Sequence, residues 1–152
     1  MVTRWLYYYA GWAQLMETEL PQWTSVGVVG GIVAWNFPLM LLVWKVAPAL
    51  AAGNTIVMKP ATYTRLSALL FAEICAEAGL PPGVVNVLTG SGSMGSKMAE
   101  HPDVDKVRLS ERGRPATASK ALQLTVTCFV AQLWLDLGGL HRQHGHWPPF
   151  ET

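Results

Sequence analysis

The sequence predicts an α/β fold, a partial Rossmann-like parallel sheet with helices between its strands, preceded by an N-terminal helix. Two observations predict it. The stretch 26–34 is a continuous apolar run rich in Val, which is typical of a strand buried on both faces. Short apolar segments then alternate with longer helical patterns, joined by turns that contain Gly or Pro. Such alternation indicates βαβ units.

The expected elements follow in order along the chain. The segment 4–20 carries Trp and Tyr on a face that can pack, and Pro21 ends it as a helix. Pro38 cannot donate to a strand ladder, so the first strand ends before it and a helix follows over 39–52. Further strands are expected at 55–59, 84–88 and 104–109, and further helices at 64–79 and 90–100. Right-handed crossovers would place successive helices on one face of the sheet.

These patterns divide the chain into three segments. We expect an N-terminal helical segment at 1–25, a partial parallel-sheet domain at 26–109, and a divergent, partly disordered tail at 110–152. The end of the tail is rich in Gly, His and Pro and has no apolar period. With 51% hydrophobic residues and a formal net charge of +1, the chain is expected to be globular, and nucleic acid is not an expected partner.

The two cysteines, Cys75 and Cys128, make neither a disulfide framework nor a zinc pattern, so a reducing, cytoplasmic location is expected. The N-terminus lacks the uniform apolar core and cleavage site of a signal peptide. The uncharged stretch 26–44 approaches the ~20 residues that a bilayer requires. Asn36 and Pro38 interrupt it, so a strand, a turn and a helix explain it better than a membrane span.

Two polar side chains follow predicted strands at the end where open α/β sheets bind ligands. The Asn36 amide can donate to an oxyanion that develops during attack on a carbonyl, or it can cap the next helix. The Lys59 amine can hydrogen-bond a ribose or neutralise a phosphate, or it can be a solvated strand-end lysine. From the residues alone, the helix cap and the solvated lysine are the favoured alternatives.

The segment 90–95, Gly-Ser-Gly-Ser-Met-Gly, has the form G-x-G-x-x-G of a dinucleotide-binding loop. It follows a predicted strand and opens a predicted helix, as that loop does. The acidic residue expected ~20 positions later is not evident, and flexible Gly/Ser loops also give this pattern by chance. The segment is therefore a candidate phosphate site that needs its structural context.

The remaining cysteine and histidine side chains do not indicate a catalytic or metal site. Cys75 has apolar neighbours in the predicted helix 64–79, which indicates a buried, unreactive thiol. His141, His144 and His146 have a spacing that a metal could use, but no acidic or cysteine ligands accompany them. No metal site is expected.

Several long motifs, taken together and in order, resemble the aldehyde dehydrogenase superfamily. They are Val33–Pro38, Trp44–Thr55, Val57–Ala61, Glu77–Val87 and His101–Val107. The resemblance covers roughly residues 8–107 and implies a fragment of the family's cofactor-binding domain with an unrelated C-terminal tail. It further implies NAD or NADP as cofactor and the oxidation of a small aldehyde to a carboxylic acid, through a thiohemiacetal on a cysteine.

The resemblance also implies roles for individual residues. Asn36 matches the amide of the family's oxyanion hole, and Lys59 matches the contact to the adenosine ribose. The residues implied in cofactor binding are Ile32, Val33, Ala34 and Trp35, which line the cleft, together with Lys59, Gly92 and Gly95.

The departures from the family pattern are specific. Ala34 replaces a usual proline, and Thr62 stands where many NAD-preferring members have a glutamate, so NAD and NADP both stay open. After Val107 the turn on the nicotinamide side is lost. No segment matches the motif of the family's nucleophilic cysteine. Asp136–Gly139 resembles only weakly the segment that holds the family's catalytic glutamate.

These departures imply a truncated or alternatively read product that is inactive alone. The alternative is a non-catalytic interaction or regulatory fragment that binds a full-length aldehyde dehydrogenase subunit or forms a homo-oligomer.

Overall fold

The computed structural model describes residues 1–110 of the chain. The expectations for the tail, for Cys128, for Asp136–Gly139 and for the three histidines near the C-terminus lie outside the described residues.

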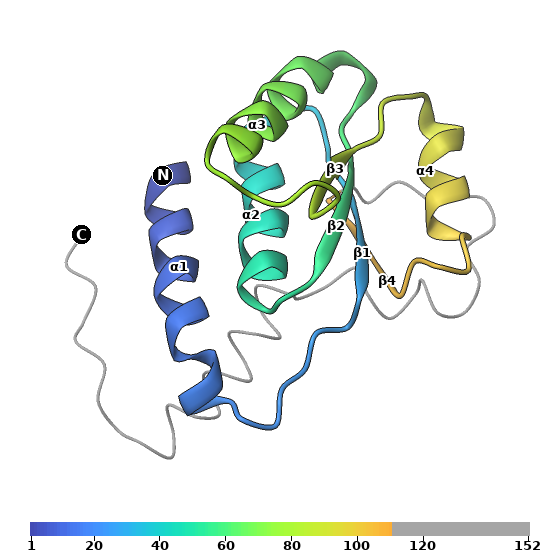
Figure 1. Ribbon diagram of the computed structural model, residues 1–152. Coiled ribbons are helices and arrows are strands. Elements are labelled where there is room, and N and C mark those ends of the chain that lie inside the picture. The colour runs from blue at the N-terminus through green and yellow to red at the C-terminus, as the bar shows by residue number, and fades with distance from the viewer. Residues whose placement is uncertain (111–152) are drawn as a thin grey trace.

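In the part of the chain that the structure describes, four parallel strands form the centre of the fold, as predicted (Figure 1). Their spatial order is β3-β2-β1-β4. In the register of β1 and β2, Val28 lies beside Thr55 and Ile32 lies beside Lys59, so the two strands end at the same edge. We call this the carboxyl edge, and the opposite one the amino edge. The strands are β1 (Val28–Ile32), β2 (Thr55–Lys59), β3 (Val85–Val87) and β4 (Lys106–Leu109).

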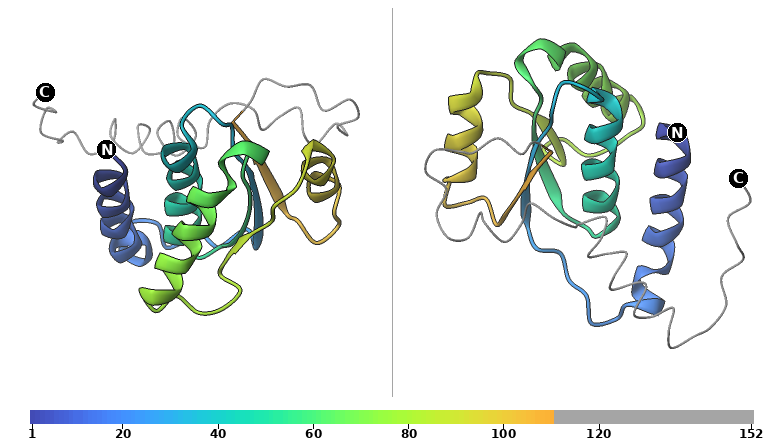
Figure 2. Two further views of the ribbon diagram at one scale, coloured as in Figure 1. Left: turned by 90° about the horizontal axis from the view of Figure 1, so that it is seen from above. Right: turned by 180° about the vertical axis from the view of Figure 1, so that it is seen from behind.

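Within residues 1–110, four α-helices flank the sheet, and their bounds lie close to the expected ones. They are α1 (Val2–Glu19), α2 (Pro38–Ala51), α3 (Arg65–Glu77), which follows a 3₁₀ turn at Thr62–Thr64, and α4 (Gly92–Ala99). Figures 1 and 2 show α2 and α3 on one face of the sheet, with α1 outside α2, and α4 on the opposite face.

The expectation that successive helices lie on one face is therefore wrong for α4. After β3, the chain crosses back over β2 and β1 to reach β4 on the far side of β1. Right-handed crossovers cover one face of a parallel sheet while the chain adds strands in one direction. They cover the other face when the chain adds strands in the opposite direction. The reversal places α4 opposite α2 and α3.

Both faces of β1 are covered, which explains its lack of polar alternation. A Cβ atom at Gly30 would lie 3.3 Å from Met98 Cε of α4, whereas one at Gly31 would collide with Met58 Sδ on the α2 side. The larger core lies on the α2 side. Its largest fully buried side chains are Leu42, Val43, Val46, Ile56 and Met58.

The aromatic residues of α1 pack against α2, as predicted from their pattern. The rings of Trp5 and Trp44 lie 6.0 Å apart, and those of Trp5 and Tyr9 lie 5.7 Å apart in an edge-on arrangement. Tyr9 is buried, and its burial, with Tyr8 nearby, raises the pKa of its phenol to about 12. Among residues 1–110, no helix is long and apolar enough to cross a membrane.

Candidate functional site

The carboxyl edge brings together the ends of β1 and β2 and the first turn of α4. A Cβ atom at Gly95 would lie 3.3 Å from Ile32 Cδ1 and 3.8 Å from Lys59 Cδ, so the glycine allows α4 to approach both strands. Gly92, the first residue of α4, has no such atom within 4 Å of its Cβ position. A helix N-terminus with open space before it is a ready site for an anion.

Lys59 is the most unusual side chain of this edge. Only 5% of the residue is exposed, so its stem lies in the interior and does not extend into solvent as that of an ordinary strand-end lysine does. Its main-chain carbonyl accepts a hydrogen bond from Val33 N at 3.1 Å, but within residues 1–110 its amine makes neither a hydrogen bond nor an ion pair. The stem of the side chain is buried, whereas the amine reaches the surface at the carboxyl edge. A ligand with hydroxyl or phosphate oxygens would find a cationic donor there.

Asn36 lies in the bend between β1 and α2. The residue that caps α2 is Phe37, and no side chain makes a capping hydrogen bond there, so the capping alternative for Asn36 is wrong. The Asn36 side chain is exposed and makes no hydrogen bond to the part of the chain that the structure describes. Its amide is therefore available to a bound molecule.

The stretch between β1 and Asn36 changes abruptly in exposure. Val33 is 3% exposed and Ala34 is 5% exposed, whereas Trp35 is 65% exposed. Ile32 is half-buried and contacts the first turn of α4 at Gly95. The structure thus brings Ile32, Lys59 and Gly95 together, and it leaves Trp35 in solvent. Their contacts with a cofactor stay a prediction.

The loops after β2 and β3 are joined beside this site. Thr62 Oγ1 donates to the carbonyl oxygen of Gly90 at 3.2 Å, and Ser91 Oγ lies 2.8 Å from Ser93 Oγ. Arg65, at the start of α3, donates from Nη1 to the Thr62 carbonyl oxygen at 3.4 Å. Sequence reasoning missed Arg65. The available signal was a cation a few residues after Lys59, in the loop that leaves the carboxyl edge.

Lys45 is a second residue that sequence reasoning missed. Its Nζ donates to Ser110 Oγ, and its Cδ lies 3.4 Å from the Cβ position of Gly31. Burial, and then the nearby charge of Arg108, lower the pKa of Lys45 to about 8. This amine loses its proton closer to neutral pH than an exposed lysine does.

Cys75 lies in α3, where it is 9% exposed and packs in the main core. Burial raises the pKa of its thiol. A buried thiol with a raised pKa supplies little thiolate, so the expectation of a structural cysteine is confirmed. No group of three His, Cys, Asp or Glu side chains within residues 1–110 could hold a metal ion.

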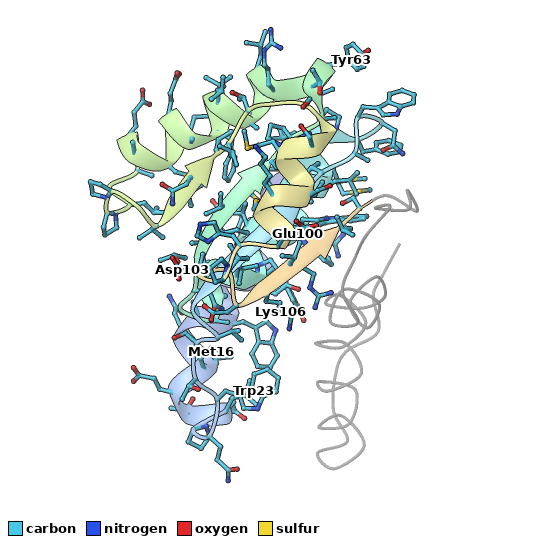
Figure 3. The ribbon with its side chains drawn as sticks, turned by 90° about the vertical axis from the view of Figure 1, so that its right-hand side faces the viewer. Met16, Trp23, Tyr63, Glu100, Asp103 and Lys106 are labelled. Atoms are coloured by element: carbon cyan, nitrogen blue, oxygen red, sulfur yellow. The ribbon has the colours of Figure 1, made fainter. Side chains whose placement is uncertain are left out.

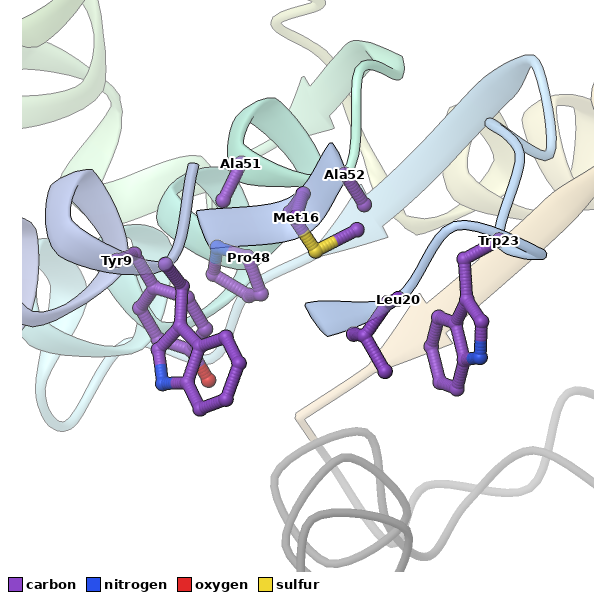
Figure 4. A pocket seen from close by; sticks show the side chains of 8 residues that line it. Tyr9, Met16, Leu20, Trp23, Pro48, Ala51 and Ala52 are labelled. Atoms are coloured by element: carbon purple, nitrogen blue, oxygen red, sulfur yellow. The ribbon is translucent and has the colours of Figure 1, made fainter. Parts of the chain in front are cut away.

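A separate apolar pocket lies between the ends of α1 and α2 (Figure 4). Met16 and Trp23, which line it, lie at the opposite end of the molecule from Tyr63, which follows β2 (Figure 3). The pocket is therefore remote from the carboxyl edge. Its lining residues are Tyr9, Trp12, Met16, Leu20, Trp23, Pro48, Ala51 and Ala52.

Comparison with known proteins gives the family. The sequence model described as "Aldehyde dehydrogenase family" matches residues 2–142. The chain belongs to the aldehyde dehydrogenase family. The match continues past Val107, where the recognised motifs end, and includes much of the tail. This corrects the expectation of a tail unrelated to the family.

Individual aldehyde dehydrogenases show the same relationship. An aldehyde dehydrogenase of Agaricus bisporus is 43% identical over 143 residues, which is 87% of this chain and 28% of that protein. The solved aldehyde dehydrogenase of Bacillus cereus has a TM-score of 0.63 at 43% identity and covers 67% of this chain and 23% of its own. The Mycobacterium tuberculosis aldehyde dehydrogenase complexed with NAD+ has a TM-score of 0.55 at 53% identity, covering 56% and 18%. The chain thus spans about a quarter of the relatives' length.

Proposed function

We propose that residues 26–109 form the part of an NAD(P)-dependent aldehyde dehydrogenase that holds the adenosine half of the cofactor. The observation that carries the proposal is Lys59, whose stem is buried beside the first turn of α4 and whose amine has no partner within residues 1–110. Ribose hydroxyls or a phosphate would supply that partner. The Mycobacterium tuberculosis relative, which is described as complexed with NAD+, supports the same cofactor class.

The parent reaction that we propose is the oxidation of a small aldehyde to a carboxylic acid, for which a bound nicotinamide accepts the hydride. The free amide of Asn36 would donate to the aldehyde oxygen while negative charge develops on it. That charge develops only when a nucleophile attacks the carbonyl carbon. Cys75 is buried among core residues of α3 and cannot be that nucleophile.

The purified chain is therefore expected to form no NADH when it is mixed with NAD and an aldehyde. Absorbance at the NADH band measures this, and Cys75→Ala and Cys128→Ala, singly and together, should leave the null result unchanged. Activity that one of these substitutions abolishes would show that the replaced cysteine is the nucleophile. Activity that survives both would contradict our account of where the nucleophile lies.

Binding of ADP-ribose tests the site itself. Calorimetric titration should show weak binding to the chain, since several contacts act together in a cofactor site and only some are present. Lys59→Met keeps an apolar stem and removes the charge, so it should weaken binding by about tenfold. Lys97→Met, at the exposed far end of α4, is the matched control and should have no effect. Equal binding by the wild-type chain and Lys59→Met would reject the role of this amine.

A second candidate function is a non-catalytic fragment that binds a full-length subunit or a second copy. The outer side of α3 favours it, because Leu66, Leu70 and Ile74 are 76%, 57% and 52% exposed and recur at every fourth residue. Such a fragment would change the rate of a full-length family enzyme to which it is added, whereas a chain that only binds cofactor would not.

The cytoplasmic location stays a prediction from the use of cysteine.

A further inference from the structure

We propose that the outer side of α3 is an interface between two copies of this chain, whose α3 helices pack antiparallel across a two-fold axis near Leu70. The inference rests on the second candidate function above, and it names a second copy of the chain as the partner. Two observations carry it. Large apolar side chains lie on the outer side of α3, and the charged residues beside them follow an order that is complementary to itself when the helix is reversed.

α3 turns its larger aliphatic side chains away from the core. The residues that it buries are Ala68, Phe71 and Cys75. The exposed residues include four large aliphatic side chains: Leu66, Leu69, Leu70 and Ile74. Figure 2 shows α3 at the periphery of the part of the chain that the structure describes. An exposed apolar patch of this kind is typical of a surface that packs against another protein.

Two rows of side chains follow this exposed side of α3. Residues four apart lie on successive turns of the same side of a helix. The apolar row is Leu66, Leu70 and Ile74. The charged row beside it is Arg65, Leu69 and Glu73, all of which are exposed. The charged row is thus basic at its start, apolar at its centre and acidic at its end.

Antiparallel packing of two α3 helices places each row against the same row of the second copy. In the apolar row, Leu66 then faces Ile74 of the second copy, and Leu70 faces its own counterpart. In the charged row, Arg65 faces Glu73 of the second copy, so that two ion pairs form in each dimer. A two-fold interface requires such self-complementarity. The order of the residues therefore favours a second copy over an unrelated partner.

Parallel packing of the same two helices is disfavoured by their charges. It would place Arg65 against Arg65 and Glu73 against Glu73 of the second copy. The dipoles of two neighbouring helices also oppose each other favourably only when the helices are antiparallel. The charged row thus sets the direction in which the two copies meet.

The charged groups are available for these ion pairs. Arg65 Nη1 donates to the Thr62 carbonyl oxygen at 3.4 Å, which leaves the other N–H groups of the guanidinium to meet a carboxylate. Within residues 1–110, neither Arg65 nor Glu73 forms an ion pair. Exposed ion pairs stabilise weakly, so the aliphatic side chains supply most of the affinity and the charges supply the orientation.

Sedimentation equilibrium of the 152-residue chain tests the interface. α3 has 13 residues and is about 20 Å long, so the interface is small, and we expect a reversible dimer with a Kd on the order of tens of micromolar. Leu70→Lys places two ammonium groups at the two-fold axis and should raise this Kd by about tenfold or more. Leu15→Lys, at an exposed leucine of α1, is the matched control and should leave the Kd unchanged.

Exchange of the charges tests the pairing of Arg65 with Glu73. Arg65→Glu alone, or Glu73→Arg alone, brings like charges together at both ion pairs, so each variant should raise the Kd by about tenfold. An equimolar mixture of the two variants should recover the wild-type affinity, because each copy then supplies the charge that the other lacks. The double variant should recover it as well. Weakened association without recovery in the mixture would contradict the pairing.

Far-ultraviolet circular dichroism checks that each variant is folded. Assemblies that persist unchanged in Leu70→Lys would show that another surface joins the copies, and this would overturn the inference. A monomeric chain that alters the rate of a full-length family enzyme would overturn the inference but not the second candidate function. A monomeric chain that leaves that rate unchanged would overturn both.

Discussion

Asn54→Ala is expected to lower the free energy of unfolding by about 3 kcal/mol. Asn54 is 5% exposed, and its Oδ1 accepts hydrogen bonds from Val26 N at 2.7 Å and Gly27 N at 3.0 Å. Its Nδ2 donates to the Ala49 carbonyl at 3.2 Å. One amide thus connects the end of α2 to the entry of β1, and alanine would leave both N–H groups without an acceptor.

Asn86→Ala is the matched control for this substitution. Asn86 is exposed on β3 and donates to the Gly83 carbonyl at 2.7 Å within its own turn, so its loss should cost less than about 1 kcal/mol. Urea unfolding monitored by circular dichroism measures both variants. Equal stability of the two would show that the Asn54 hydrogen bonds do not hold β1 in place.

Gly31→Val is expected to lower the free energy of unfolding by about 2 kcal/mol, because the interior has no room for the side chain. A Cβ atom there would collide with Met58 Sδ and would lie 3.4 Å from Lys45 Cδ. Met58 is fully buried, so its side chain cannot move into solvent. The substitution also adds methyl groups that α2 must accommodate by moving away from β1.

Gly11→Ala is the control, because nothing lies within 4 Å of its Cβ position in α1. Alanine is the better helix former, so this variant should gain about 0.5–1 kcal/mol. Thermal unfolding should show a lower midpoint temperature than wild type for Gly31→Val and a higher one for Gly11→Ala. A Gly31→Val protein as stable as wild type would contradict the close packing of β1 against Met58 and α2.

Much of the fold could be predicted because its pattern is local. The bounds of β2 agree with the expected 55–59, since Gly53 and Pro60 limit this strand on either side. β1 is shorter than expected and ends at Ile32. Val33 still donates to the Lys59 carbonyl, but it and Ala34 are buried outside the strand. A run of apolar residues indicates that a segment is buried, but it does not show where the hydrogen-bonded strand ends within that segment.

The face of α4 could not be predicted, since it depends on which strand β4 pairs with. That pairing joins Val29 to Lys106, residues far apart in the sequence, and no local pattern specifies it. The candidate site was found at the strand ends, at Asn36 and Lys59, from the fold class together with the motifs. Arg65 and Lys45 were missed because their roles come from contacts with Thr62 and Ser110.

Amide chemical shifts of the ¹⁵N-labelled chain, recorded while ADP-ribose is added, test the central claim most directly. The account predicts that shifts will concentrate at the carboxyl edge, at Lys59, Gly92 and Gly95, where α4 approaches β1 and β2. The apolar pocket, followed at Met16 and Trp23, should not respond. Shifts centred on that pocket, or a spectrum unchanged at millimolar ADP-ribose, would contradict the placement of the cofactor site at the carboxyl edge.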